Sequence, residues 1–253
     1  MAQWLDTAWL EFDYRILQAI HNFAVMMGGE NGFFTWFMRF ISFLGEGGWA
    51  LLAMGAALCL FRKTRRAGLC VLVAIICGSL ITDVTLKNLV ARTRPFRRED
   101  VQAFADWWQY IGSTHAGKRS FPSGHTTSAV AAMTALFLTL PKKYSWTAFL
   151  FAFLTALSRM YLVVHYPTDI LGGILAGLTA AIVGYFLVKW LSKTLQRHEN
   201  IPAVRLLLQF DLIEVIRGRR QGKKHETLET VCENEQEMPA DATVGEEPPQ
   251  GEA

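Results

Sequence analysis

The sequence has little cysteine. Four residues, Cys59, Cys70, Cys77 and Cys232, occur in a chain of 253, and none belongs to a Cys-x-x-Cys pair. Small disulfide-held scaffolds and cysteine zinc sites need several cysteines at short spacing, so both are excluded. The first three fall in apolar runs, where a free thiol behaves as a small buried hydrophobic group.

Charge is also missing over long stretches. The chain is 51% hydrophobic and 19% charged, which excludes disorder over its whole length and a collagen-like chain. Of its 47 charged residues, 19 lie in 195–253, which leaves 28 among the first 194. Residues 225–253 contain nine acids and neither Lys nor Arg. The net charge of +3 is therefore the difference between a basic body and an acidic tail, and it says little about partners.

Five long runs are almost free of charge. They cover residues 41–61, 67–90, 124–140, 145–164 and 170–188. Runs of roughly 17–25 apolar residues match the thickness of the hydrocarbon core of a bilayer. The sequence therefore predicts an all-α polytopic membrane bundle of five to six spans, with its membrane-embedded core over 41–194.

The first 40 residues have a different pattern. Charged residues interrupt the apolar and aromatic positions of 4–27, which gives amphipathic spacing. We expect this segment to lie on the membrane surface, with a sixth, weakly apolar span as the alternative. Residues 33–40 are expected to form a second short helix, either interfacial or at the entry to the first span. No basic stretch precedes an apolar core, so a signal peptide is not expected.

Basic residues mark one side of the predicted bundle. They occupy the loops 62–66 and 141–144, and they follow the last span from Lys189 onward. Because positive loops stay in the cytoplasm, segments 91–123 and 165–169 are predicted to be extracytoplasmic and the C-terminal tail cytoplasmic. The first of these outer segments is nevertheless rich in Arg and Lys. That departure from the rule calls for a local reason, such as an anionic ligand.

The polar tail divides into a basic part, 195–224, and an acidic part, 225–253. The basic part is expected to lie along anionic lipid at the cytoplasmic face or to form a solvated linker. The acidic part has few aromatic residues, which is typical of a disordered segment.

The first of three polar clusters at predicted helix ends runs from Lys87 to Pro95. Lys87 and Arg94 are seven residues apart, two helical turns, so they share a face while the helix lasts. Pro95 is expected to end the helix at Arg94. Asp83, one turn before Lys87, is expected to pair with it or to be a polar residue at the interface. Snorkelling of the two basic side chains at a membrane edge is the simpler alternative.

The second cluster is Phe121-Pro122-Ser123-Gly124-His125. Pro-Ser-Gly predicts a turn directly before an apolar run, so the cluster falls at a helix N-terminus. Free amides and the helix dipole favour an anion there, and glycine lets a ligand approach the backbone closely. An ordinary serine cap is the alternative.

The third cluster runs from Ser158 and Arg159 to His165 and Asp169. Pro167 predicts the first turn of the last span, which places His165 just before the helix and Asp169 in its first turn. A carboxylate four residues after a histidine can accept from one imidazole nitrogen and leave the other free to attack. The alternative is an interfacial histidine beside an acid that complements the helix dipole.

All three clusters fall on the same side of the predicted bundle. Together they supply cations, two histidines, a carboxylate and a helix N-terminus, the groups that phosphate binding and transfer require. Ionisable residues at membrane depth are costly, which itself indicates function. Spaced as K-x6-R-P, P-S-G-H and S-R-x5-H-x3-D, the clusters resemble the signature of the type 2 phosphatidic acid phosphatase (PAP2) superfamily, over roughly residues 40–190.

The resemblance implies an enzyme with three catalytic residues. His165 would attack phosphorus and form a phosphohistidine, Asp169 would orient it, and His125 would protonate the leaving oxygen. The implied phosphate-binding residues are Lys87, Arg94, Ser123, Gly124 and Arg159. No metal or other cofactor is expected, because the family needs none and the sequence has no carboxylate cluster suited to magnesium.

The resemblance also implies partners and a location. The expected partners are a lipid phosphate or diphosphate substrate and the surrounding membrane lipids, with no nucleic acid, while the oligomeric state is left open. Candidate substrates are polyprenyl diphosphate, phosphatidylglycerophosphate and phosphatidate, hydrolysed at the extracytoplasmic face of the plasma membrane. A lipid phosphotransferase of the same fold and a non-enzymatic transporter are the alternatives. The aromatic residues of 91–123, such as Phe104 and Trp107, are expected to anchor in the outer leaflet or to line a lipid entrance.

Overall fold

A computed structural model of the chain describes residues 2–198 and 200–201. These residues belong to the first of two units, 1–210 and 211–253. The acidic tail 225–253 and most of the basic segment 195–224 lie outside the described residues, together with the predictions made for them. The part that is described is helical, and its only β-type pairing is an isolated bridge between Thr93 and Arg119. The predicted all-α fold class is confirmed.

The helices follow one another with short connections in most places. In chain order they are α1 (Ala2–Ala8), α2 (Leu10–Met26), η1 (Gly29–Asn31), α3 (Phe33–Gly45), η2 (Glu46–Gly48), α4 (Trp49–Cys59), α5 (Arg65–Ser79), η3 (Leu80–Leu86, π-helical), α6 (Lys87–Val90), η4 (Pro95–Arg97), α7 (Gln102–Tyr110), α8 (Gly124–Thr139), α9 (Lys142–Ser145), α10 (Ala148–Tyr161) and α11 (Pro167–Arg197).

Three helical stretches among the described residues are long and apolar enough to cross a membrane. They are Phe33–Cys59, Arg65–Val90 and Pro167–Arg197. The other two predicted spans are helical but shorter, because α8 has 16 residues and α10 has 14, below the roughly 20 residues of a typical span. Most side chains of α8 are buried, so its lack of charge suits the interior of the bundle.

The first long stretch begins earlier than the sequence predicts. Residues 33–40 are not a separate helix, because α3 runs without a break from Phe33 to Gly45. The interruption comes instead at η2, where Gly47 and Gly48 have φ angles of 57° and 71°. Glycine adopts this left-handed region without steric cost, so the chain can turn there and begin α4 at once.

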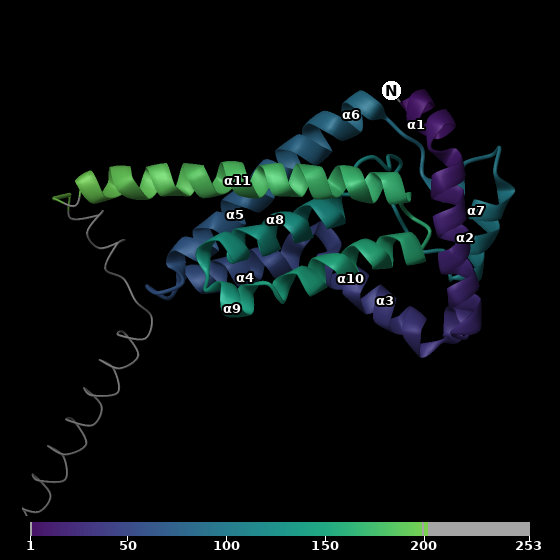
Figure 1. Ribbon diagram of the computed structural model, residues 1–253, viewed down its shortest axis with the longest axis horizontal. Helices are drawn as coiled ribbons and strands as arrows, with labels where there is room; N and C mark the ends of the chain where they lie inside the picture. Colours follow the sequence, from purple (N-terminus) through teal and green to yellow (C-terminus); the bar gives the residue numbers. More distant parts are fainter. Residues whose placement is uncertain (1, 199, 202–253) are drawn as a thin grey trace, which may run out of the picture. The chain divides into compact units, whose positions relative to one another are not determined.

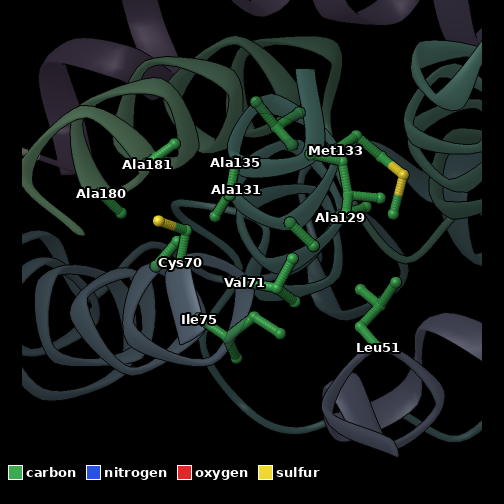
Figure 2. Packing of buried hydrophobic residues seen from close by; sticks show 14 of the residues in the cluster. Leu51, Cys70, Val71, Ile75, Ala129, Ala131, Met133, Ala135, Ala180 and Ala181 are labelled. Carbon is green, nitrogen blue, oxygen red and sulfur yellow. The ribbon is translucent and has the colours of Figure 1, made fainter. Parts of the chain in front are cut away.

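The core is formed where α5, α8 and α11 pack together. In Figure 1, α8 runs alongside α11 with α10 on its other side, and α5 contacts both α8 and α11. Figure 2 shows the alanines of α8 and α11, such as Ala131 and Ala180, at this contact with Cys70 and Val71 of α5. Small side chains let helix backbones approach closely, which is how apolar helices gain packing energy without a hydrophobic driving force between them.

The N-terminal helix α2 crosses the ends of α10 and α11 instead of running along them (Figure 1). Its buried positions are Asp13, Leu17 and Ala24, which lie on one face, so the helix is amphipathic. The buried face differs from the predicted apolar pattern because it includes the charged residue Asp13, while Trp9 and Phe12 are exposed. The helix is not among the three stretches long and apolar enough to span. Its place at the membrane surface stays a prediction.

The segment between α6 and α8 packs against α2. Phe104 of α7 is fully buried and makes an edge contact with Tyr166, and Trp107 lies 5.4 Å from the ring of Tyr14. Phe96 stacks on Trp108 with ring centroids 4.4 Å apart. Phe104 and Trp107 are therefore inner packing residues and not a lipid anchor.

The contact between α8 and α11 makes a prediction about Gly177. A Cβ built at this position would lie 2.8 Å from the carbonyl oxygen of Thr127 and 2.8 Å from Cβ of Val130. We expect Gly177→Val to destabilise the protein by about 1–3 kcal/mol through overpacking. The measurement is the Tm of the purified protein in detergent. The control is Leu175→Ala, an exposed position on the same helix, and an unchanged Tm for Gly177→Val would contradict close packing here.

Candidate active site

Lys87 and Arg94 lie on different kinds of backbone, since Lys87 is helical and Arg94 is extended. α6 ends at Val90, and Ala91 takes a left-handed conformation with φ of 53°. The expected helix end at Arg94, and the helical face that it was to share with Lys87, are therefore wrong. The chain leaves the helix one turn earlier than Pro95 requires, because a left-handed residue cannot continue it. Arg94 is extended, as a residue before proline prefers.

Lys87 lies beside the start of α8. Its Nζ is 2.6 Å from Oδ1 of Asp83, and Oγ of Ser79 donates to the other oxygen of that carboxylate at 3.0 Å. The expected pairing of Asp83 with Lys87 is confirmed. A Cβ built at Gly124 would lie 3.4 Å from Nζ of Lys87. The first and second clusters therefore meet, and glycine at 124 leaves the space for that approach.

α8 begins at Gly124, so the predicted helix N-terminus is confirmed, and Ser123 caps it, which is the alternative role for this residue. Its Oγ accepts from the backbone N–H of Thr126 at 3.4 Å and from the hydroxyl of Thr126 at 3.0 Å. Its own backbone N–H donates to the carbonyl oxygen of Asp169 at 3.1 Å. That bond ties the start of α8 to the first turn of α11, so the second and third clusters also meet.

His165 lies just before α11, which begins at Pro167 as predicted. Nδ1 of His165 is 3.3 Å from Oδ2 of Asp169. The same oxygen accepts from the backbone N–H of Tyr166 at 2.9 Å. On the opposite side of the ring, Nε2 of His165 is 3.2 Å from Nη1 of Arg94. His165 and Asp169 are 1% and 0% exposed.

These contacts assign the tautomer of His165. An ionised carboxylate only accepts hydrogen bonds, and a guanidinium only donates them. The ring therefore holds its proton on Nδ1, facing Asp169, and presents the Nε2 lone pair to Arg94. The nitrogen with the lone pair is the one that faces the cation Arg94, one of the predicted phosphate-binding residues.

The surroundings of His165 disfavour its charged form. Burial, reinforced by the nearby cations Arg94, Arg159 and Lys87, holds the pKa of His165 well below its ordinary value. Burial also lowers the pKa of Arg94 to about 10, which leaves the guanidinium cationic at neutral pH. The pair at neutral pH is thus a neutral imidazole beside a cation, which suits a nucleophile that must meet an anionic substrate.

Arg159 comes from the last turn of α10 and is buried. Its Nη1 donates to Oγ of Ser42 on α3. Its Nε has no hydrogen-bond partner among the described residues. A buried guanidinium donor without an acceptor is costly, and a phosphoryl oxygen would supply the missing acceptor.

His125 lines two cavities. One, of about 400 Å³, is also lined by Lys87 and Gly124, and the other, of about 370 Å³, by Arg94 and Arg159. Five of the eight predicted site residues therefore lie in the walls of two spaces that share His125. The remaining three, Ser123, His165 and Asp169, are buried behind those walls, and His165 is joined to the second cavity through its contact with Arg94.

Two buried residues of the site were missed in the sequence. Arg92 is fully buried, and its Nη1 donates to Oδ1 of Asp169 at 3.0 Å. Asp13 of α2 is also fully buried, and it accepts from Nη2 of Arg92 at 2.8 Å. A signal was available for Asp13, because a carboxylate on the same helical face as Leu17 and Ala24 has no reason to be there unless it has a partner.

The residues of the described ranges offer no obvious place for a metal. Over 2–198 and 200–201, no group of three or more His, Cys, Asp or Glu is arranged to hold an ion. The groups that would contact a phosphate are instead the guanidinium, ammonium and amide donors described above.

Comparison with known proteins gives consistent matches. The model of the PAP2 superfamily matches residues 67–193, which include all three clusters. A lipid A 4'-phosphatase of Porphyromonas gingivalis is 32% identical over 183 residues, 69% of this chain and 73% of that protein. The undecaprenyl-diphosphatase BcrC of Bacillus subtilis is 29% identical over 70% of this chain and 83% of that protein. The crystal structure of Aquifex aeolicus LpxE is 26% identical, with a TM-score of 0.54 over 68% of this chain and 93% of that one.

The assigned tautomer can be measured. We expect the ¹⁵N NMR signals of His165 in detergent-solubilised protein to show a protonated Nδ1 and an unprotonated Nε2 between about pH 5.5 and 8. The ring is expected to stay neutral over this range because its pKa is lowered, so it does not take up a second proton as the pH falls through the ordinary titration range of histidine. The signals are assigned by their loss in His165→Ala. A doubly protonated ring near neutral pH would contradict the assignment.

Proposed function

Because this chain belongs to the PAP2 superfamily, we propose that it releases phosphate from a lipid phosphate or diphosphate ester through a phosphohistidine on His165. The observation that carries the proposal is the neutral, buried His165, whose Nδ1 faces Asp169 and whose Nε2 lone pair faces Arg94. A nucleophile held by a third group and aimed at the binding cations is the arrangement that covalent phosphoryl transfer needs.

The first chemical step forms a bond between Nε2 of His165 and phosphorus. Before the attack, Nη1 of Arg94 contacts that nitrogen. A phosphoryl oxygen is a stronger acceptor for a guanidinium than an imidazole lone pair, so the incoming substrate draws the donor away and frees the lone pair. As the N–P bond forms, the bond between phosphorus and the lipid oxygen breaks, and His125 donates a proton to the departing oxygen.

The second step restores the enzyme. Water attacks the phosphohistidine, His125 accepts the proton of that water, and inorganic phosphate leaves as the N–P bond breaks. Asp169 stabilises the positive charge that the ring acquires while phosphorus is bound. Lys87, Arg94 and Arg159, with the amide of Gly124, hold the phosphoryl oxygens as their charge develops. Neither step of this proposed reaction requires a metal.

The neighbours in the family support a substrate class. Proteins named lipid A 4'-phosphatase, undecaprenyl-diphosphatase and phosphatidylglycerophosphatase B all resemble this chain. Their substrates share a phosphate at the polar end of a lipid. The site lies close to long apolar helices, so a substrate can keep its tail in the bilayer while its phosphate reaches the cations. We propose a lipid of this kind as substrate.

The test replaces the nucleophile. We expect His165→Ala to lower phosphate release by roughly 10³-fold or more across a panel of undecaprenyl diphosphate, phosphatidylglycerophosphate, lipid A and phosphatidate. The purified protein is assayed with EDTA present, and rapid quenching with ³²P-labelled substrate should trap an acid-labile phosphoprotein that His165→Ala lacks.

His198→Ala is the matched control, because this histidine follows the far end of α11 and Nδ1 of its exposed ring is 2.9 Å from the carbonyl oxygen of Thr194. Undiminished activity in His165→Ala would overturn the proposed nucleophile. Loss of wild-type activity in EDTA would overturn the metal-free mechanism. Phosphate appearing on an added alcohol instead of in solution would identify a phosphotransferase.

We further propose that the site opens to the extracytoplasmic side and that the C-terminal tail is cytoplasmic. The support is the clustering of basic residues in loops 62–66 and 141–144, at the opposite ends of the helices from the site.

Cysteine labelling tests this orientation. In a Cys232→Ser background, Lys118→Cys and Lys63→Cys each place a thiol at an exposed position, one near the site and one in a basic loop. We expect a membrane-impermeant maleimide added to intact cells to label the Lys118→Cys variant and to spare the Lys63→Cys variant until the cells are opened. The reverse pattern would show that the site faces the cytoplasm.

A further inference from the structure

We propose that Asp13 of the N-terminal helix is a positioning residue for the reaction, acting on the Asp169–His165 pair through Arg92 and Thr168. This inference rests on the proposed function and extends the site to a helix outside the matched family region 67–193. It concerns a chain of buried charges that links Asp169 and Arg92 of the sequence clusters to Asp13, which lies outside all three clusters.

Arg92 is the centre of this chain. Its guanidinium is fully buried and donates in three directions. Nε donates to Asp6 at 2.8 Å, Nη2 to Asp13 at 2.8 Å, and Nη1 to both Thr168 and Asp169 at 2.6 and 3.0 Å. Burial acts to lower the pKa of Arg92, but the carboxylates, Asp169 foremost, raise it well above its ordinary value, so the group stays charged.

Asp13 uses both of its oxygens inside the fold. Oδ1 accepts from the backbone N–H of Thr168 at 3.0 Å, and Oδ2 accepts from the hydroxyl of Thr168 and from Arg92, each at 2.8 Å. Thr168 is the residue before Asp169 in the first turn of α11. Asp13 therefore fixes the backbone that bears Asp169 and, separately, the cation that contacts its carboxylate.

The charges explain why a second carboxylate is needed. Arg92 alone, 3.0 Å from Asp169, would neutralise the carboxylate that must stabilise a positively charged phosphoimidazole. With Asp13 also on Arg92, Asp13, Arg92 and Asp169 together hold one net negative charge beside His165. Asp6, the third carboxylate on Arg92, is paired with Arg98 as well, at 3.3 Å. The guanidinium is shared among three carboxylates, so it does not draw Asp169 away from Nδ1 of the ring.

The first prediction concerns Asp13→Asn, which keeps the shape and an acceptor for Thr168 but removes the charge. We expect kcat to fall about 10- to 100-fold, the range seen when a supporting partner of a functional residue is lost, while KM stays within about twofold because no group touching the phosphate changes. Glu11→Gln is the matched control, an acid-to-amide change on the same helix at an exposed ion pair with Arg15.

A double-variant cycle separates positioning from simple support of α2. Arg92→Gln leaves Asp13 and Asp169 buried without their cation, so we expect it to lose more activity than Asp13→Asn. Combining the two changes restores the net charge of the wild-type group, so the double variant should be more active than Arg92→Gln alone. If Asp13 only holds α2 in place, the double variant will be no more active than the less active single variant. KM will then also change together with kcat.

An NMR measurement that does not depend on turnover distinguishes loss of positioning from misfolding. In Asp13→Asn the ¹H signal on Nδ1 of His165 should shift, because the hydrogen bond to Asp169 changes strength, while Tm stays near that of Glu11→Gln. An unmoved signal with unchanged kcat would overturn the inference. Failure of the proposed function is distinct, since the wild-type protein would then release no phosphate, or His165→Ala would be as active as wild type.

Discussion

The contacts of Asp169 join the parts of the candidate active site. Its carboxylate meets Nδ1 of His165, the N–H of Tyr166 and the guanidinium of Arg92, and its carbonyl oxygen accepts from Ser123. One residue in the first turn of α11 thereby connects the start of α8, His165 and the segment after α6. A fully buried carboxylate must have all of these partners, because an unpaired charge in this position would cost several kcal/mol.

The apolar part of the bundle makes that polar cluster possible. α5, α8 and α11 approach closely through alanines and glycines, and Gly173 of α11 lies so near Ser123 that an added Cβ would be 2.9 Å from its carbonyl oxygen. The backbone bond between α8 and α11 needs this closeness. Helix packing and active-site geometry are therefore one constraint, since a larger residue at the contact would separate the helix ends that meet at the site.

Position along the bundle sets the chemistry of each region. The helices long enough to cross a bilayer have exposed leucine, valine and phenylalanine along their length, such as Leu175 and Phe186 of α11. The buried charges Asp13, Arg92 and Asp169 meet near the start of α11. This is also where α2 crosses the ends of α10 and α11 (Figure 1). A lipid phosphatase of the PAP2 type needs this division, because its substrate has an apolar tail and an anionic head.

Features that depend on neighbours in the chain can be predicted from the amino-acid sequence. The all-α class, the helix start at Ser123, the proline that begins α11, the Asp83–Lys87 pair and the family signature all follow from spacing and local chemistry. Helix packing sets the other features: Arg94 lies on an extended segment, α8 is an inner helix, and Asp13 binds Thr168, 155 residues away. Hydrogen bonds to a buried charge depend on which helix ends are packed together, and no spacing within one segment encodes the contacts of a helix that crosses the bundle from elsewhere in the chain.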